Sequence, residues 1–425
     1  MKIAVLGLWH LGCVTAACAA RHFDVIGLDF DASVVAGLQK GAAPLFEPGL
    51  DALLQAGLAS GRLRFTADAI TACAEADLLW VAYDTPVDDD DRADVECVLG
   101  QVRRCMPALR RGALVLLSSQ LPVGTCRQLE DELLGLGYRF ACSPENLCLG
   151  DAIAIFEKPD RVIIGYRDAQ ARAELELLFR PFSSEIVWMR PESAEMTKHS
   201  INSFLALSIT FINEVARLCD VTGADAKEVE KGLKSERRIG PSAYLSPSGA
   251  FAGGTLARDV VTFINLGQKY GESLDVIPAI KRSNDRHRQW TFQQIQKAFA
   301  GQTGGCIVLL GLTYKPGTNT LRRSAAVELA RALDAAGFQV RACDPSQPPL
   351  PVELGFIEFK ASVMEAVAGA DAVVVCTAWP EFLKLDWTDL ISRLRRPLVV
   401  DVGRFLQKSV AGLPALRYVT IGSPS

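Results

Sequence analysis

Two glycines and an aspartate near the start of the chain have the spacing of a dinucleotide-binding site. Gly7 and Gly12 enclose the segment Leu8-Trp9-His10-Leu11, which follows an apolar run and opens a helical pattern. Asp29 ends the next apolar run, 22 positions after Gly7. Such glycines let the backbone approach a pyrophosphate, and such a carboxylate accepts from a ribose diol. Since Asp29 would repel a 2′-phosphate, the spacing predicts NAD rather than NADP.

Trp9 departs from this fingerprint because its position is normally the middle glycine. An indole there should crowd the pyrophosphate. One interpretation is a retained NAD site whose Trp9 ring turns away, and the other is a Rossmann-like fold with a weakened or absent site. The intact context favours the retained site, for which the candidate cofactor contacts are Gly7, Trp9, His10, Leu11, Gly12 and Asp29.

The glycine-rich segment belongs to a longer alternation of short apolar runs and helical patterns. This alternation predicts a doubly wound, mostly parallel sheet, with strands at 2–7, 25–29, 78–82, 113–118, 139–141 and 161–164. A second α/β region is predicted near the C-terminus, with a helix at 324–336 and strands at 306–311, 339–344, 372–377 and 398–401. The two regions are not an obvious sequence repeat.

A helical region separates the two α/β regions. Apolar residues at three- and four-residue steps predict a long helix over 192–223, capped by Ser193 and ended by Gly223. More helix follows to about residue 234, then a loop rich in Gly, Pro and Ser, and further helices at 259–270 and 278–300. We expect an α/β protein with two Rossmann-like doubly wound domains joined by a long central helix and a helical core. The expected domains are 1–190, with the dinucleotide fingerprint, 191–300, which is helical, and 301–425, with the second α/β region.

Composition excludes several other classes of protein. A length of 425 residues predicts two or three domains, and a net charge of −4 argues against nucleic-acid binding. The twelve cysteines are scattered without a Cys-x-x-Cys pair, which predicts free thiols in a reducing, cytoplasmic setting and no metal site. The first twenty residues imitate a signal peptide, but a βαβ start explains them better. Without a long apolar stretch, no membrane span is expected.

Five short motifs then occur in a specific order and spacing. They are Glu47-Pro48-Gly49-Leu50, Asp84-Thr85-Pro86, Leu121-Pro122-Val123-Gly124-Thr125, Ser143-Pro144-Glu145-Asn146-Leu147 and Pro159-Asp160-Arg161-Val162-Ile163-Ile164-Gly165. Together they resemble the UDP-glucose/GDP-mannose dehydrogenase family, in which the second motif reads Gly-Thr-Pro. The resemblance implies NAD-dependent oxidation of a nucleotide sugar, a UDP-sugar being favoured because that branch is the broadest. It adds Thr85, Pro86 and Gln120 to the expected cofactor contacts.

The resemblance also implies an active site. Glu145 matches a glutamate that helps deprotonate the sugar hydroxyl or manages water. Lys198 and Asn202 match helix residues that stabilise oxyanionic intermediates, and their spacing of four lets both face one pocket. The segment 250–260 resembles the glycine-rich catalytic loop, with Thr255 in place of the nucleophilic cysteine and Asp259 in place of its aspartate.

Further positions match the family's substrate contacts. A homodimer built on the helix at 192–223 is expected, because so long an apolar helix between two α/β domains needs a partner surface. Arg238 matches an Arg-Ile-Gly motif that contacts substrate across a dimer interface in relatives. The resemblance thus assigns dimerisation and the active site to 191–300 and the nucleotide sugar to 301–425. Phe251 and Gly253 lie in the glycine-rich loop. Lys315 and Arg322 match residues that hold the nucleotide diphosphate, the first as a point charge and the second as a planar fork.

The loss of the cysteine leaves four interpretations open. A threonine hydroxyl is a poor nucleophile without an adjacent base, and no histidine is near in sequence, the four being His10, His22, His199 and His287. The first interpretation is a two-electron oxidoreductase that stops at the aldehyde or ketone, or that oxidises a hydrated aldehyde without covalent capture. The others are a redox-neutral epimerase, a full dehydrogenase with another nucleophile, and a non-catalytic nucleotide-sugar binder.

Overall fold

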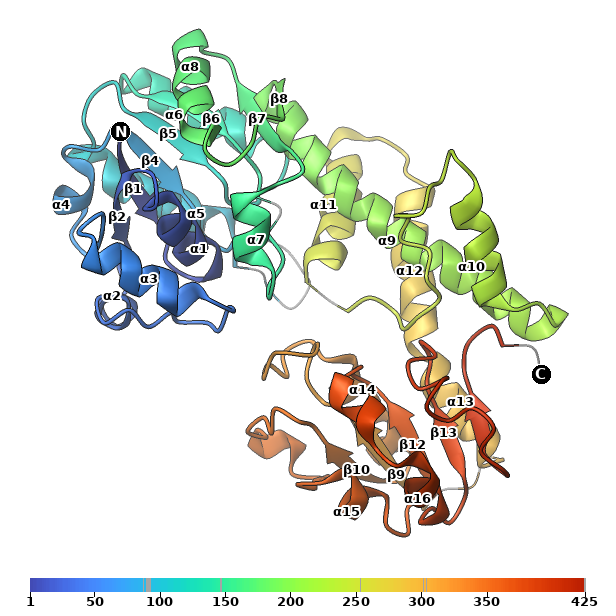
Figure 1. The fold of residues 1–425 in the computed structure, drawn as a ribbon. Coiled ribbons are helices and arrows are strands. Elements are labelled where there is room, and N and C mark those ends of the chain that lie inside the picture. The colour runs from blue at the N-terminus through green and yellow to red at the C-terminus, as the bar shows by residue number, and fades with distance from the viewer. Residues whose placement is uncertain are drawn as a thin grey trace. The chain divides into compact units, whose positions relative to one another are not determined.

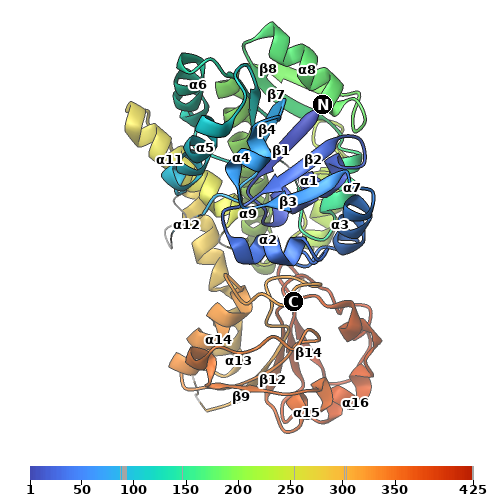
Figure 2. The same cartoon turned by 90° about the vertical axis from the view of Figure 1, so that its left-hand side faces the viewer.

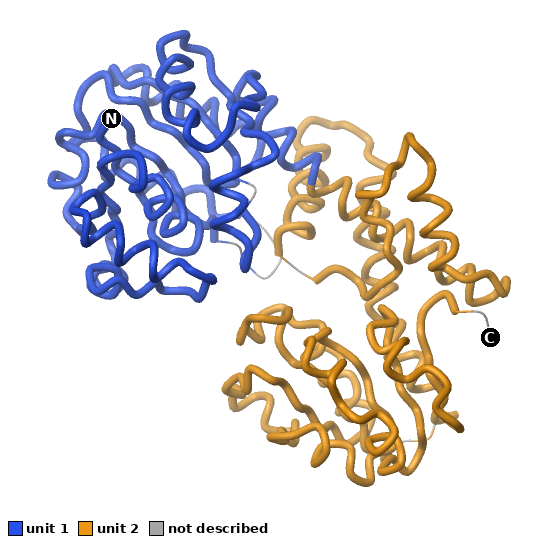
Figure 3. The backbone as a smooth tube through the Cα atoms, viewed as in Figure 1, with its two compact units in different colours: residues 1–201 blue, residues 202–425 orange. Residues whose placement is uncertain are grey.

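The computed structural model describes residues 1–86, 88, 93–145, 147–252, 254–300, 302 and 304–423. The chain divides into two compact units, residues 1–201 and 202–425 (Figure 3). The boundary falls inside one long helix, α9 (Pro191–Thr222). The predicted division into three domains stays a prediction.

An eight-stranded sheet forms the centre of the first unit (Figure 1). Its strand order is β3-β2-β1-β4-β5-β6-β7-β8, and every pair is parallel except β6 with β7. The first six strands follow the order of a dinucleotide-binding Rossmann domain. The strands are β1 (Lys2–Leu6), β2 (Asp24–Leu28), β3 (Leu63–Thr66), β4 (Leu78–Val81), β5 (Leu114–Leu117), β6 (Arg139–Cys142), β7 (Val162–Tyr166) and β8 (Ile186–Met189).

Helices cover both faces of this sheet, as the turned view shows (Figure 2). Alternate residues of each strand point to opposite faces, so Ile3 and Val5 of β1 join one core while Ala4 and Leu6 join the other. The first core includes α1 (His10–Ala19), α2 (Ala32–Leu38), α3 (Leu50–Ala59), α7 (Ala152–Glu157) and α8 (Ala169–Phe179). The second includes α4 (Ala69–Cys73), α5 (Val95–Cys105), η1 (Met106–Ala108), α6 (Thr125–Gly135) and the start of α9.

The second unit contains a six-stranded, wholly parallel sheet. Its order, β11-β10-β9-β12-β13-β14, repeats the Rossmann order of the first unit. The strands are β9 (Cys306–Leu310), β10 (Gln339–Cys343), β11 (Ile357–Phe359), β12 (Ala372–Val375), β13 (Leu398–Val400) and β14 (Arg417–Val419). Its helices, besides the rest of α9, are α10 (Ala226–Ser235), α11 (Thr255–Tyr270), α12 (Val276–Arg288), α13 (Trp290–Ala298), α14 (Ala325–Ala335), η2 (Val352–Leu354), α15 (Val363–Val367), η3 (Pro380–Lys384) and α16 (Trp387–Ser392).

All ten predicted strands are present, and the predicted fold class is confirmed. The four strands that the sequence analysis missed are β3, β8, β11 and β14, which are the edges of the two sheets. A central strand of a parallel sheet is buried on both faces and forms a continuous apolar run, whereas an edge strand is shorter and less apolar. The edge strands therefore lack the signal by which the central strands were recognised.

The helix boundaries were predicted less well than the strands. The long helix begins at Pro191, so the prediction of Ser193 as its N-cap is wrong, although Gly223 follows its end with a φ of 77°. The helix predicted over 278–300 is two helices, α12 and α13, which meet at Gln289. Residues 1–20 form β1 and α1, as the βαβ interpretation predicted.

Candidate functional site

Gly7 and Gly12 allow the turn from β1 into α1 to close. Gly7 has a φ of 91°, and the ring of Tyr83 lies 2.7 Å from where its Cβ would stand. A Cβ on Gly12 would lie 1.6 Å from the carbonyl oxygen of Gly7. Neither position accepts a side chain, so the turn has the backbone shape that a dinucleotide-binding loop needs. The residues present therefore fit an NAD pyrophosphate at the start of α1.

Asp29 ties this loop to the turn after β2 through its two carboxylate oxygens. Its Oδ2 accepts from the backbone N–H of Leu8 at 2.7 Å, and its Oδ1 accepts from the N–H of Asp31 at 2.9 Å. Each oxygen has a second lone pair with which to accept from a ribose hydroxyl. Trp9 has a negative φ of −89°, which any residue adopts, and its side chain is exposed. Replacement of the middle glycine by Trp9 therefore introduces no backbone strain.

Glu47 joins the start of α1, next to the loop at 7–12, to the segment that carries Glu145. Its side chain is buried, and His10 Nε2 lies 2.8 Å from its Oε2. The N–H groups of Gly150 and Ala152 donate to the same carboxylate at 2.8 and 2.9 Å. The sequence analysis quoted Glu47 in a motif without a role, and the structure gives it one in positioning the start of α7.

Two of the predicted cofactor residues meet at the carboxyl ends of adjacent strands. The hydroxyl of Thr85, after β4, donates to the carbonyl oxygen of Gln120, after β5, at 2.8 Å. Pro86 continues the first of these loops, and its carbonyl accepts from Asp94 N. Ligands of open α/β sheets bind at this end of the strands, beside the point where the strand order reverses.

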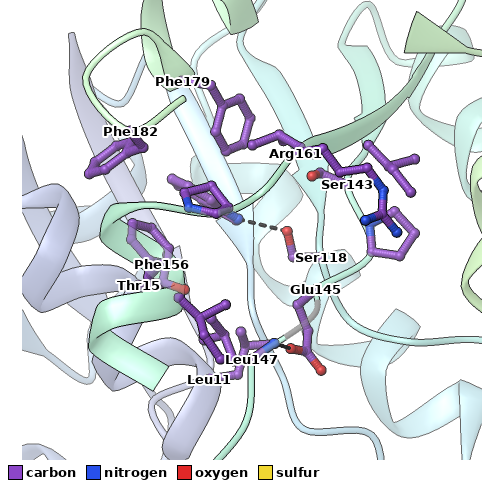
Figure 4. A pocket seen from close by; sticks show the side chains of 16 residues that line it. Leu11, Thr15, Ser118, Ser143, Glu145, Leu147, Phe156, Arg161, Phe179 and Phe182 are labelled. Carbon is purple, nitrogen blue, oxygen red and sulfur yellow. Dashed lines mark hydrogen bonds between the residues drawn. The ribbon is translucent and has the colours of Figure 1, made fainter. Parts of the chain in front are cut away.

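Glu145 lies beside a largely apolar cavity of about 80 Å³ in the first unit (Figure 4). Its carboxylate accepts from the N–H of Leu147, which turns the side chain back along its own loop. Figure 4 shows Glu145 at one end of the cavity and Phe179 and Phe182 at the other. Glu145 thus presents a carboxylate at an apolar surface, which suits a group that exchanges a proton with a ligand.

Lys198 is buried beside a smaller cavity. The polar residues that line it include Lys198, Glu195 and His199 of α9, together with Ser119 and Gln120 from the strand ends. It shares Pro144 with the larger cavity, so the segment that carries Glu145 lines part of both cavities.

Glu195 anchors α9 against α6 and so fixes the register of Lys198. Its two oxygens accept from the N–H groups of Gly124 and Cys126 at 2.8 Å each, at the N-terminus of α6. Burial raises the pKa of the Glu195 carboxyl, although these hydrogen bonds act against the rise. The ring of His199 contacts the carbonyl of Leu121 at 2.9 Å. The sequence analysis missed Glu195, whose signal was a lone acid one turn before Lys198.

Asn202 and Asp259 meet inside the second unit. The Asn202 amide donates to Asp259 Oδ2, and both side chains are buried. Asn202 is one turn beyond Lys198 on α9, as its spacing predicted. Arg258 Nε lies 3.6 Å from the other oxygen of Asp259. Asp259 therefore accepts a hydrogen bond from the Asn202 amide and forms an ion pair with the Arg258 guanidinium.

Thr255 is the first residue of α11, and it is exposed. Within the described part of its unit, no base is hydrogen bonded to its hydroxyl. Gly254 precedes it with a φ of 108° and a ψ of −139°, a conformation that is essentially restricted to glycine. The helix begins four residues earlier than predicted, so Thr255 and Asp259 lie one turn apart on α11.

The glycine-rich loop before α11 is held by three buried polar side chains. Asn213 accepts from Ser248 N at 3.0 Å, and Asn284 accepts from Phe251 N at 3.0 Å while donating to its carbonyl at 2.9 Å. His287 Nε2 lies 2.8 Å from the carbonyl of Ser248. Phe251, predicted to contact substrate, packs against the small core of α9, α11 and α12. Gly253 lies outside the described residues.

His287 is neutral in this arrangement. Arg217 Nη1 donates toward Nδ1 at 3.1 Å, so Nδ1 accepts and the Nε2–H donates to the carbonyl of Ser248. Burial, and to a lesser degree the charge of Arg217, lowers the pKa of His287 to about 4. The sequence analysis missed Asn213, Asn284 and His287, because nothing in their local sequence distinguishes them from ordinary helix residues.

The predicted phosphate partners lie in loops of the second unit. Lys315 and Arg322 belong to the turn between β9 and α14, at the carboxyl end of β9. Arg238 follows α10, is highly exposed and pairs with Glu236 at 2.9 Å. Arg323, which was not predicted, has a φ of 59° and places Nη1 3.5 Å from where a Cβ of Gly254 would stand. It therefore lies against the N-terminus of α11.

The second sheet repeats the loop geometry of the first. Gly311 follows β9 with a φ of 86°, and Leu312 N donates to Asp344 Oδ2 at 2.7 Å, as Leu8 N does to Asp29. Burial alone would raise the pKa of Asp344, but hydrogen bonds from Ser346, Thr313 and Leu312 outweigh it and lower the pKa. The two α/β regions therefore share strand order and loop anchoring without an obvious sequence repeat.

Family models match most of the chain, in three parts. Residues 1–183 match the NAD binding domain of the UDP-glucose/GDP-mannose dehydrogenase family, residues 192–286 its central domain, and residues 308–408 its UDP binding domain. The chain belongs to the UDP-glucose/GDP-mannose dehydrogenase family. Membership makes the protein an NAD-dependent oxidoreductase that acts on a nucleotide sugar, and the third match supports a UDP-sugar.

Relatives of this family align along nearly the whole chain. A UDP-glucose 6-dehydrogenase of Pseudomonas aeruginosa is 34% identical over 94% of this chain and 93% of its own length. One of Rhizobium meliloti is 33% identical over the full length of both. The solved UDP-glucose dehydrogenase of Pyrobaculum islandicum has a TM-score of 0.87 at 31% identity, covering 100% of this chain and 98% of its own.

The remaining findings concern membranes and thiols. Among the described helices, none is long and apolar enough to span a membrane. All twelve cysteines are free thiols, and Cys148, on the Glu145 segment, is the exposed one among them. The chain thus carries an exposed thiol three positions after the candidate catalytic acid Glu145.

Proposed function

We propose that the protein oxidises the 6-hydroxyl of a UDP-sugar, with UDP-glucose as the first candidate, by one hydride transfer and without covalent capture of the aldehyde. The observation that carries this proposal is Thr255. It stands at the nucleophile position of the family's loop, exposed and without a hydrogen-bonded base in its unit. A hydroxyl has a far higher pKa than a thiol, so it does not form the adduct that a second oxidation uses.

The remaining residues support the first oxidation. NAD, when bound, accepts the hydride from the alcohol carbon. We assign Glu145 to receive the hydroxyl proton, because its carboxylate lies at an apolar surface. We assign the Lys198 ammonium and the Asn202 amide to stabilise negative charge on the sugar oxygen, and both side chains are buried. A hydride, which carries two electrons, and the hydroxyl proton then leave the alcohol as it becomes an aldehyde.

The backbone before α11 supports the view that only the nucleophile has been replaced, without a change in the shape of the loop. Ala250 and Ala252 stand where relatives have glycines, and methyl groups would disturb the loop if these residues needed a positive φ. Neither is among the described residues with a positive φ. The three buried side chains Asn213, Asn284 and His287 hold the loop around them. A cysteine at position 255 would therefore stand at the start of α11.

The test measures how many molecules of NADH are formed for each molecule of sugar nucleotide consumed. Purified protein is given UDP-glucose and NAD, with GDP-mannose and dTDP-glucose in parallel, and NADH is followed by absorbance while the sugar is identified by mass spectrometry. One NADH per sugar and an aldehyde product support the proposal. Two NADH per sugar with a carboxylate product would overturn it. An altered sugar without net NADH, or binding without turnover, would also overturn it.

Cofactor contacts follow from the loop geometry. We propose that Asp29 accepts from the adenosine ribose and that the exposed Trp9 ring points away from the pyrophosphate. The free lone pairs of Asp29 and the negative φ of Trp9 support this arrangement. Calorimetric titration should show NAD binding more tightly than NADP. Equal affinities, or tighter binding of NADP, would contradict it.

We also propose a homodimer and a reducing compartment. On α9, Phe204, Phe211 and Leu218 recur at seven-residue intervals and are 67%, 49% and 62% exposed, which is unusual for side chains this apolar. Arg238 is then assigned to contact the substrate bound by the partner subunit.

Free thiols at all twelve cysteines support a location in the cytoplasm. Three domains, at 1–190, 191–300 and 301–425, are proposed because the three family models begin and end near these limits.

A further inference from the structure

The first turn of α1 already holds a carboxylate in this structure. Trp9 precedes the helix without a capping side-chain hydrogen bond, and the first turn contains no acidic residue. The backbone N–H of Leu11 instead donates to Asp84 Oδ2 at 3.1 Å. Asp84 is exposed and comes from the loop after β4, 73 positions further along the chain. A charge from a distant segment thus satisfies an amide that the helix itself leaves unpaired.

The same amides are the ones that a bound dinucleotide uses. In a Rossmann domain the pyrophosphate lies against the N-terminus of the first helix, where N–H groups and the helix dipole favour negative charge. The motif around Asp84 resembles a family motif that begins with glycine, which has no side chain to place there. Position 84 therefore carries an acid at the point where the cofactor brings its own negative charge.

A second acid adds to the negative field at this point. Asp29 holds the neighbouring amide of Leu8 at 2.7 Å. After the larger effect of burial, the charges of Asp29 and Asp84 both raise the pKa of the Cys13 thiol, which lies on α1 itself. The potential at the start of the helix is thus more negative than the helix dipole alone would make it.

We propose that Asp84 is a built-in competitor of the cofactor's pyrophosphate. Its carboxylate occupies the Leu11 amide in the free protein and must leave before a diphosphate oxygen can accept from the same N–H. Binding then replaces a hydrogen bond that already exists, and it brings like charges together if Asp84 stays near. The result is weaker binding of NAD, and of NADH after the reaction, than the loop alone would give. The proposal rests on NAD as the cofactor, and it is independent of how far the sugar is oxidised.

The test is Asp84→Asn. An asparagine has nearly the same volume and an oxygen that can still accept from Leu11 N, but it has no charge. We expect the dissociation constants of NAD and ADP-ribose, measured by calorimetry without any sugar nucleotide, to fall by roughly tenfold, as expected when a like charge is removed from a helix N-terminal anion site. Adenosine, which has no pyrophosphate, should bind with unchanged affinity. Asp84→Gly should shift the affinities in the same direction.

Asp94→Asn is the matched control. Asp94 caps α5, accepting from Cys97 N at 3.0 Å, and asparagine caps a helix equally well. This variant removes the same charge, ten positions along the chain, and should change the NAD dissociation constant less than about twofold if only long-range charge is lost. Unfolding midpoints add a second readout. Asp84→Asn should lower the midpoint of the free protein while enlarging the rise caused by saturating NAD.

Two results would overturn the inference. One is an Asp84→Asn variant that binds NAD no more tightly than wild type or Asp94→Asn. The other is a gain for adenosine as large as that for ADP-ribose, which would place the effect away from the pyrophosphate. Either result leaves the count of NADH per sugar untouched, so failure here and failure of the proposed oxidation are told apart.

Discussion

In the proposed function, a single side chain, Thr255, limits the oxidation to one step. The N-terminus of a helix lowers the pKa of a thiol placed there, and α11 begins at this residue. A cysteine at this position would therefore be an activated nucleophile, whereas the hydroxyl is not. On the proposed assignment, position 255 keeps the helix N-terminus that would activate a thiolate, but it carries a hydroxyl instead.

We predict that wild type forms no covalent sugar adduct and that Thr255→Cys does. Intact mass after turnover should equal that of the free chain for wild type and for the control Thr255→Ser. Thr255→Cys should show an added sugar nucleotide and release more than one NADH per sugar. An adduct on wild type would contradict the prediction, and peptide mapping would show whether the exposed Cys148 carries it.

His287 makes stability depend on pH in a defined window. Its folded pKa is about 4 because the ring is buried, against about 6.5 in the unfolded chain. Between these values the unfolded state binds a proton that the folded state does not, so stability falls as pH drops from about 6.5 to 4 and is unaffected above. The loss should reach about 3 kcal/mol at pH 4.

The comparison is made with His287→Gln, which can still donate to the carbonyl of Ser248 but does not titrate. Unfolding in urea at a series of pH values should give wild type the steeper loss between pH 6.5 and 4. The exposed His22→Gln serves as the control and should keep the slope of wild type. Equal slopes for wild type and His287→Gln would show that the ring takes up a proton in the folded state.

At the scale of elements, buried acids fasten segments that are far apart in the sequence. Glu47 accepts from His10, Gly150 and Ala152, and so ties the start of α1 to the start of α7. Glu195 does the same between α9 and α6. These contacts fix the strand-end loop that carries Glu145 and the part of α9 that carries Lys198.

We predict that Glu47→Ala destabilises the protein by about 3 kcal/mol, because three donors lose a buried acceptor at about 1 kcal/mol each. Denaturant unfolding measures this loss. Asp51→Asn is the control, since Asp51 is exposed and accepts from Ala43 N alone among the described donors. Its effect should stay below about 1 kcal/mol. A similar small loss for both variants would mean that water replaces the Glu47 carboxylate.

At the scale of the whole molecule, the exposed apolar side chains of α9 are the surface on which we propose that two copies associate. We predict a homodimer that Phe211→Glu converts to a monomer, because a charge would be buried among apolar side chains. Light scattering at micromolar concentration measures the mass of each. Leu177→Glu, on a helix of the first unit and 61% exposed in wild type, is the control and should leave the dimer intact. A monomeric wild type would contradict the prediction.

The sequence by itself determined the architecture and the kind of ligand. Apolar periodicity gave every central strand, since each is buried on both faces, and Gly7, Gly12 and Asp29 predicted the cofactor loop because its sterics are contained in one βαβ segment. Only the tertiary structure decided which groups hydrogen bond to each other across long stretches of sequence. Asp84 meets Leu11 across 73 positions, and Glu47 meets Ala152 across 105. Such pairs leave no local pattern, because only the packing of strands and helices brings their side chains within hydrogen-bonding distance.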